Sequence, residues 1–399
     1  MAERRLTPQV VLRIALVYLS ARLVTTGFFL LAANLSGPAS RFGEHATLGD
    51  LLMGWDAQWY WLVAESGYPS ELPRSDDGVV EQNAWAFMPL YPYLAKALSL
   101  PFGGFYPPAA ILVSLVAGFL ACLALYVLLR DRLDADATLW AVVFFAAGPL
   151  AALFQVGYAE SLFLLWLLLA LIALRRRSWW WLYALIPLMG YTRPGVLAFS
   201  LLLALYGIWR FFRRSRDPLP VRDVVHIVAL GLLAAAVGFS WQVIAAVVTG
   251  DPGAYLETEL SWRRAWTGAH EAGFVPFEGW IQAAGIWFPL WGLPAWLGVV
   301  LLVVLGGGAA ALLLWHRDVR RLGVVMRLWA ASYLIYLLAV FFPQSSLFRL
   351  LVPLAPLSGA LAAPRHPAWR IGVLVACLGA QWWWIFNMYA QGNTYMQIP

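Results

Sequence analysis

The chain has 399 residues, of which 62% are hydrophobic and 12% are charged, and its mean hydropathy is +0.72. Soluble domains carry about 25% charged residues, so this composition excludes an ordinary soluble protein. The net charge is +6, but the arginines stand in short clusters between apolar runs, which excludes a continuous nucleic-acid-binding surface. Apolar runs of about 18 residues or more recur along the chain and do not alternate as barrel strands do. We therefore predict an all-α polytopic membrane protein.

The first apolar run, near residues 10–33, is too long for the core of a signal peptide and predicts the first transmembrane helix. A more polar stretch at 34–106 follows and predicts a long loop. Beyond it, clusters of arginine interrupt the apolar runs, and such clusters mark cytoplasmic loops. They lie at Arg4, Arg5 and Arg13, at Arg130 and Arg132, at 175–177, at 210–222, at 317–321, and at Arg365 and Arg370.

Between neighbouring clusters there is room for two helices and one outward loop, which predicts about eleven transmembrane helices. The N-terminus is then inside and the C-terminus outside. In 179–212, Pro194 predicts a break between two short helices. No internal repeat is visible, so we predict one membrane domain over 1–399, with large outward loops at 34–106 and 250–286. Shorter outward turns are predicted at 155–161, around Arg193 and at 341–349.

In the first outward loop, apolar and aromatic residues recur at spacings of three and four over residues 49–66. This pattern predicts a helix that lies in the membrane interface and does not span. Asp56 stands in it beside Trp55 and Trp59. A carboxylate in a partly desolvated aromatic pocket can act as a general base. The alternative is a solvated aspartate on an interfacial helix.

Arg193 and Arg349 each stand at a predicted outward helix end beside apolar residues, where an unpaired guanidinium is costly. A lipid phosphate is a suitable partner because the guanidinium is a planar fork of donors. The alternative is a structural ion pair, for example with Glu160. The five histidines show no metal-ligand spacing, and acidic residues of the first loop are scattered, so we predict neither a metal nor a cofactor.

Five motifs occur in order along most of the chain. They are "WDAQWYWLVAESGYP" at 55–69, "EQNAWAFMPLYP" at 81–92, "GYAESLF" at 157–163, "YTRPGVL" at 191–197 and "SSLFRLLVPLAPL" at 345–357. Together they resemble the PIG-V family, the second mannosyltransferase of GPI-anchor assembly, and its bacterial relatives. That family carries a WD motif, an aromatic run ending in GY, and elements like AFFPLYP, YTESLF, TRSNGVL and a late S-x-x-R-hydrophobic-P. The chain departs from the family pattern at Gln58, where eukaryotic members often have histidine, and at Met88, which replaces a phenylalanine.

The resemblance implies a GT-C glycosyltransferase that transfers mannose from a polyprenyl-phosphate carrier to an acceptor hydroxyl on the extracytoplasmic face of the cell membrane. Its usual base is an acidic residue of the first outward loop, and Asp56 matches that position. Arg349 and Arg193 are the residues expected to bind the donor phosphate. The residues expected around the substrate are Trp55, Trp59, Tyr60, Asn83, Tyr91 and Glu160, although packing is the commoner role for a tyrosine such as Tyr91.

Two other functions compete with this one. A transporter or lipid flippase would need charged residues deep in the spans, whereas the ionisable groups of this chain cluster at the ends. A noncatalytic partner of another membrane enzyme would not need an intact WD motif. The mannose is carried by the resemblance alone, so arabinose or glucose carriers remain open. The acceptor is equally open among glycolipids, glycans and proteins. Membrane lipids are expected partners, and nucleic acid is not.

Overall fold

The computed structural model describes residues 6–267, 274–393 and 397–399, and within these ranges the chain is built of helices and turns. No β-strand occurs in them, although Arg74 and Val80 form one isolated antiparallel bridge. The predicted all-α fold class is confirmed for these residues.

Length and apolarity identify five helices in the described ranges that can cross a membrane. They are α1 (Pro8–Leu35), α5 (Tyr106–Leu129), α10 (Val221–Thr249), α13 (Ala295–Trp315) and α18 (Pro367–Ile385), which continues as η5 (Phe386–Gln391). The shorter helices of the body are α6 (Ala135–Ala146), η3 (Ala151–Phe154), α7 (Glu160–Arg176), α8 (Trp179–Gly190), α9 (Val196–Phe212), α12 (Glu278–Leu290), α15 (Val324–Val340), α16 (Leu347–Leu350), η4 (Val352–Leu357) and α17 (Ser358–Ala362). The number of about eleven spans stays a prediction.

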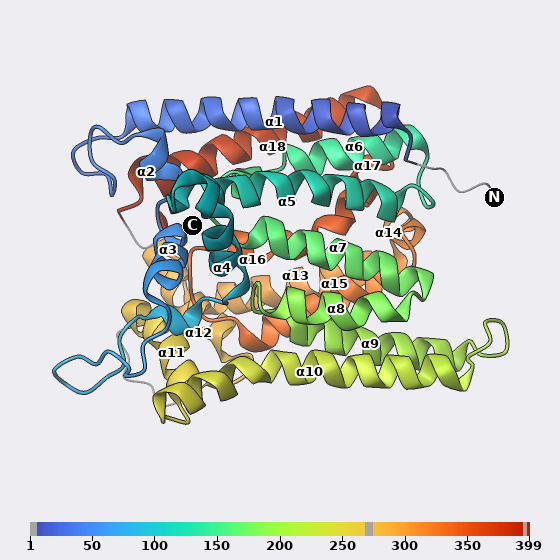
Figure 1. The fold of residues 1–399 in the computed structure, drawn as a ribbon. Coiled ribbons are helices and arrows are strands. Elements are labelled where there is room, and N and C mark those ends of the chain that lie inside the picture. Colours follow the sequence, from blue (N-terminus) through green and yellow to red (C-terminus); the bar gives the residue numbers. More distant parts are fainter. Residues whose placement is uncertain (1–5, 268–273, 394–396) are drawn as a thin grey trace.

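The long helices run side by side, and their connections gather at two opposite ends (Figure 1). One end carries α14 (Arg317–Arg321) and the turn between α9 and α10, which hold two of the arginine clusters. We call it the arginine end. The opposite end, which we call the loop end, carries α2 (Leu48–Leu52), α3 (Asp56–Ser66), η1 (Ala84–Ala86), α4 (Leu90–Ser99), η2 (Leu100–Phe102) and α11 (Ala254–Thr267). The arginine-bearing turns and the polar loops, which the sequence predicts to face opposite sides of a membrane, therefore lie at opposite ends of the structure.

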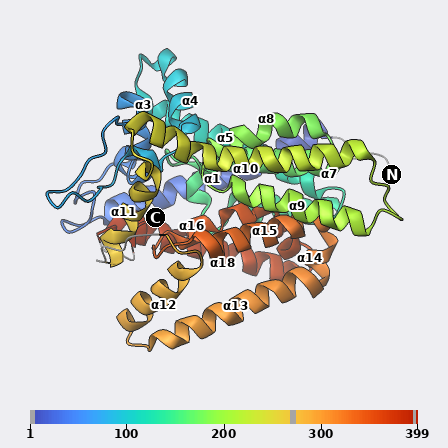
Figure 2. The same cartoon turned by 90° about the horizontal axis from the view of Figure 1, so that it is seen from below.

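Helices α12 and α13 form a hairpin that projects from one side of the body (Figure 2). In α13 the buried position is Gly298, and large apolar side chains such as Val303 and Leu305 are more than half exposed. A helix that is apolar all round and exposed in this way is suited to contact with lipid tails.

The break predicted within 179–212 is confirmed, because α8 ends at Gly190 and α9 begins at Val196. The single helix predicted over 49–66 is wrong. The structure has two helices there, and the chain turns between them at Trp55, whose φ of 55° lies where glycine is favoured. Hydrophobic periodicity continues across this turn, so the pattern alone could not reveal it.

Candidate active site

A cavity of about 1280 Å³ lies toward the loop end, between α3, the start of α9, α10, α11, α15 and the segment around α16. Much of its wall is apolar and includes Leu197, Val237 and Leu337. Several predicted site residues share this wall, and they are Trp55, Asp56, Trp59, Tyr60, Arg193 and Arg349. The cavity thus joins charged groups to an apolar surface, as expected where an amphiphilic molecule binds.

Four charged side chains from distant parts of the sequence meet at the edge of this cavity. Arg349 Nη1 lies 2.7 Å from Asp56 Oδ2, and Arg349 Nε lies 3.3 Å from Glu160 Oε1. Arg193 Nη1 pairs with the same oxygen of Glu160. The two positive and two negative charges cancel, and the ion pair considered for Arg193 and Glu160 is present.

Burial makes these contacts matter more than they would at a surface. The side chains of Glu160 and Arg349 are 4% and 10% exposed, and that of Asp56 is 24% exposed. Burial acts to lower the pKa of Arg349, but the charges of Asp56 and Glu160 outweigh it and hold the pKa above its ordinary value. Arg349 therefore stays a cation, and removal of one partner would leave a buried charge uncompensated.

The turn before α3 places Asp56 at the first position of that helix. The N-terminus of a helix stabilises a negative charge through its unpaired N–H groups and dipole. Trp55 holds the turn in place, since its indole Nε1 donates to the carbonyl of Met388 at 2.9 Å and Arg41 lies 4.3 Å from its ring centroid. Contacts distant in sequence therefore fix the position of the Asp56 carboxylate.

Aromatic rings cover the wall of the cavity next to Asp56. The rings of Trp59 and Phe87 stack with centroids 5.6 Å apart, and Trp262 meets Trp59 edge-on at 5.5 Å. Tyr60 is nearly fully buried and packs edge-on against Phe87 and Tyr91. Such packing fixes the ring positions, so the aromatic wall is formed before any ligand arrives.

Three predicted substrate residues lie behind the cavity wall and do not line it. The Tyr91 hydroxyl is buried, donating to the Ala110 carbonyl at 2.8 Å and hydrogen-bonding with Ser114. Asn83 is also buried, and its Oδ1 accepts from the Trp85 N–H at the start of η1. Glu160 lies behind the two arginines. These residues support the wall, so direct contact with substrate stays a prediction for them.

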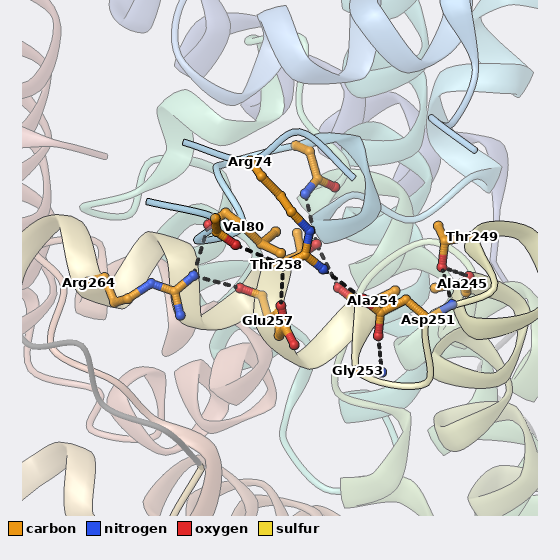
Figure 3. Close-up of polar contacts among 12 residues, drawn as sticks. Arg74, Val80, Ala245, Thr249, Asp251, Gly253, Ala254, Glu257, Thr258 and Arg264 are labelled. Carbon is orange, nitrogen blue, oxygen red and sulfur yellow. Dashed lines mark hydrogen bonds and ion pairs between the residues drawn. The ribbon is translucent and has the colours of Figure 1, made fainter. Parts of the chain in front are cut away.

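The loop between α3 and α4, part of the predicted first outward loop, is tied to α11 and to the turn before it by polar contacts, drawn in Figure 3. Arg74 pairs with Asp251 at 2.9 Å and with Glu257 at 3.7 Å. Asn83 Nδ2 donates to the Thr258 hydroxyl at 2.9 Å, where both side chains are buried. These contacts hold α11 beside the cavity.

Sequence reasoning missed the part of the wall that α11 supplies, including Tyr255, Glu259 and Trp262. No motif covers these positions, and a single glutamate in a polar loop gives no signal by itself. The contribution of α11 depends on which of its faces turns inward, and the contacts with the first loop decide that.

No protein-family model matches the chain, and no curated protein sequence matches it. Three solved structures of an oligosaccharyltransferase from the archaeon Archaeoglobus fulgidus are similar to it at 13% identity. One is a complex with Zn and sulfate (TM-score 0.47, covering 92% of this chain and 53% of that chain). Another, named AglB, holds an inhibitory peptide and a dolichol-phosphate (0.44, 90% and 54%). A third is tethered to an acceptor peptide with the NVT sequon (0.38, 95% and 56%).

This chain thus spans about half the length of those oligosaccharyltransferase chains.

Proposed function

We propose that this protein is an inverting glycosyltransferase of the GT-C type, which moves mannose from a polyprenyl-phosphate carrier to an acceptor hydroxyl. The observation that carries the proposal is the 2.7 Å contact between Arg349 and Asp56 on the wall of a large, mostly apolar cavity. The contact puts an anion-binding group beside a carboxylate that can accept a proton. This pair meets the two needs of glycosyl transfer from a lipid phosphate.

In the proposed reaction, Arg349 and Arg193 bind the phosphate of the carrier through their planar donor groups. The acceptor oxygen attacks the anomeric carbon, and the carbon–oxygen bond to the phosphate breaks on the opposite face of the sugar ring. The bonding electrons leave with the phosphate, and the proton of the acceptor hydroxyl passes to Asp56. A phosphate is already a good leaving group, so the second carboxylic acid of many glycoside hydrolases is not required.

Arg349 has a second role in this scheme, which is to keep Asp56 paired until the donor binds. When the carrier phosphate binds Arg349, the contact between Arg349 and Asp56 breaks. The phosphate gives Arg349 a new anionic partner, while Glu160 still compensates the pair of arginines. Asp56 is then available to the acceptor hydroxyl. The apolar side chains at Leu197 and Val237 provide surface for the prenyl chain.

The choice of mannose rests on the five motifs that resemble the PIG-V family. The choice of the extracytoplasmic face rests on the arginine clusters, which mark the cytoplasmic side and lie at the end opposite the polar loops.

The test is a transfer assay with the purified protein in lipid nanodiscs. Polyprenyl phosphates that carry radiolabelled mannose, glucose or arabinose are each incubated with a membrane lipid extract. We expect label from the mannosyl carrier to appear in an acceptor product, with inverted anomeric configuration. Bound carrier with no transfer from any of the three sugars would contradict the proposal. Movement of intact carrier between the leaflets of proteoliposomes would favour a flippase instead.

A further inference from the structure

One face of α11 forms a wall of the cavity that the proposed reaction does not use. Tyr255, Glu259 and Trp262 lie at spacings of four and three along this helix, which puts them on one side of it. All three line the cavity. Glu259 is thus a carboxyl group in the same cavity as Asp56, on a different helix.

Helix α11 faces α3 across this part of the cavity. The Trp262 ring is 5.5 Å from that of Trp59 and 5.9 Å from that of Phe87, both in edge-on contact. Trp59 comes one helical turn after Asp56, and Trp262 comes one turn after Glu259. Two carboxyl groups are therefore held on facing helices beside a shared cluster of indole rings.

Glu259 and Arg193 share a neighbour on the cavity wall, Tyr336. Tyr336 of α15 lines the cavity and interacts electrostatically with both Glu259 and Arg193. A group attached directly to a phosphate on Arg193 and Arg349 would lie in the same cavity as this wall. In the proposed donor, that group is the sugar.

The chemistry of the wall suits a sugar better than a second phosphate or a lipid tail. A carboxylate repels phosphate, and a polar carboxyl group is a poor neighbour for a prenyl chain. Burial raises the pKa of Glu259 to about 7, and a hydrogen bond with Tyr255 opposes that shift. Near neutral pH the carboxyl can therefore donate to a hydroxyl oxygen or accept from a hydroxyl group. Indole rings provide rigid apolar area beside it.

We propose that α11 forms the subsite for the sugar of the lipid-linked donor, with Glu259 hydrogen-bonding the sugar hydroxyls and Trp262 packing on the ring. This inference rests on the proposed function, since it takes the phosphate at Arg349 and Arg193 as its starting point. Glu259 here is a group that selects and positions the donor, while Asp56 remains the base.

The experiment compares the binding of two purified ligands, polyprenyl phosphate with and without mannose, to the full chain in nanodiscs. In an assay at pH 8, above the pKa of Glu259, the substitution Glu259→Gln keeps the shape of the side chain and removes the charge, and a hydrogen bond to a charged group is roughly twice as strong as a neutral one. We expect the Kd of the mannosyl carrier to rise about 10-fold, while the Kd of the sugar-free carrier stays the same. Trp262→Leu should show the same difference between the two ligands.

Two variants provide the controls. Glu71→Gln changes an exposed glutamate of the predicted first outward loop that does not line the cavity, and it should leave both Kd values unchanged. Arg349→Ala should weaken both ligands alike. Equal weakening of both ligands in Glu259→Gln and Trp262→Leu, or no weakening of either, would overturn the sugar subsite alone. Failure of the wild-type chain to bind either carrier would overturn the proposed function together with this inference.

Discussion

Arg349 is the residue on which the site depends most, because it contacts two carboxylates at once and lines the cavity. The ion pairs with Asp56 and Glu160 by themselves would indicate a structural role for Arg349. Arg349 also lines the cavity, so an incoming anion can reach its guanidinium. The positive charge of that guanidinium is already balanced by the two carboxylates. When an anion binds, Arg349 can exchange its carboxylate partner for that anion, so its buried positive charge never lacks a partner.

We expect Arg349→Ala to raise the Kd of the polyprenyl-phosphate donor by about 10- to 100-fold, since charge-assisted hydrogen bonds contribute about 1.5–3 kcal/mol. Arg349→Lys should fall between wild type and alanine because lysine keeps the charge but lacks the planar fork. Donor binding to folded protein, checked by gel filtration, measures both variants. Equal donor affinity in wild type and Arg349→Ala would leave Arg349 with a structural role only.

At the residue scale, the sequence predicted that Asp56, Arg193 and Arg349 share one end of the protein, and the structure brings them together with Glu160. The arginine clusters and the motifs were sufficient for that. They could not assign the pairs, because each contact depends on how helices from distant segments pack. Glu259 was missed for the same reason, since the orientation of α11 is set by tertiary contacts.

The element that positions the base is the turn between α2 and α3. The backbone of Trp55 has φ 55° and ψ −124°. A residue other than glycine adopts such a conformation at a cost of about 1–3 kcal/mol. The hydrogen bond of its indole to Met388 and the stacking of Arg41 offset that cost. Hydrophobic periodicity favours a continuous helix here and Gly54 disfavours one, so the contact with Met388 near the far end of the chain helps to fix the turn.

This strain predicts an order of stability for two variants that both lose the indole. Trp55→Gly should be more stable than Trp55→Ala by about 1 kcal/mol, because glycine has no Cβ to oppose a positive φ. Thermal unfolding of both proteins in the same detergent measures the difference, and both should transfer sugar more slowly than wild type. A glycine variant no more stable than the alanine variant would mean that the turn relaxes when the indole is lost.

At the scale of the whole molecule, the separation of an arginine end from a loop end is the feature on which the assigned membrane side rests. Composition was sufficient to predict a helical membrane protein, and clusters of arginine were sufficient to separate the loops. The number of spans is harder to predict, because helices such as α6 and α8 have 12 residues each and are short for a complete crossing.

Cysteine labelling in intact cells tests the assigned side. Asp77 lies exposed in the predicted first outward loop, and Arg214 lies exposed in the turn between α9 and α10. A membrane-impermeant thiol reagent should label Asp77→Cys and leave Arg214→Cys unlabelled until the cells are opened. The parent chain controls for its own cysteines, of which Cys122 is buried and Cys377 partly buried. The reverse pattern would move the proposed site to the cytoplasmic face.

The central claim is that the carboxylate of Asp56 is the base, and turnover of Asp56→Asn in the nanodisc transfer assay tests it most directly. Asparagine keeps the shape of the side chain and removes the basicity, so kcat should fall about 10²- to 10⁴-fold. Donor affinity should be unchanged or tighter, because Arg349 loses its competing contact with Asp56 and keeps Glu160. Near-normal turnover by Asp56→Asn would contradict the account, and the base would then have to be sought among Glu65, Glu81 and Glu160.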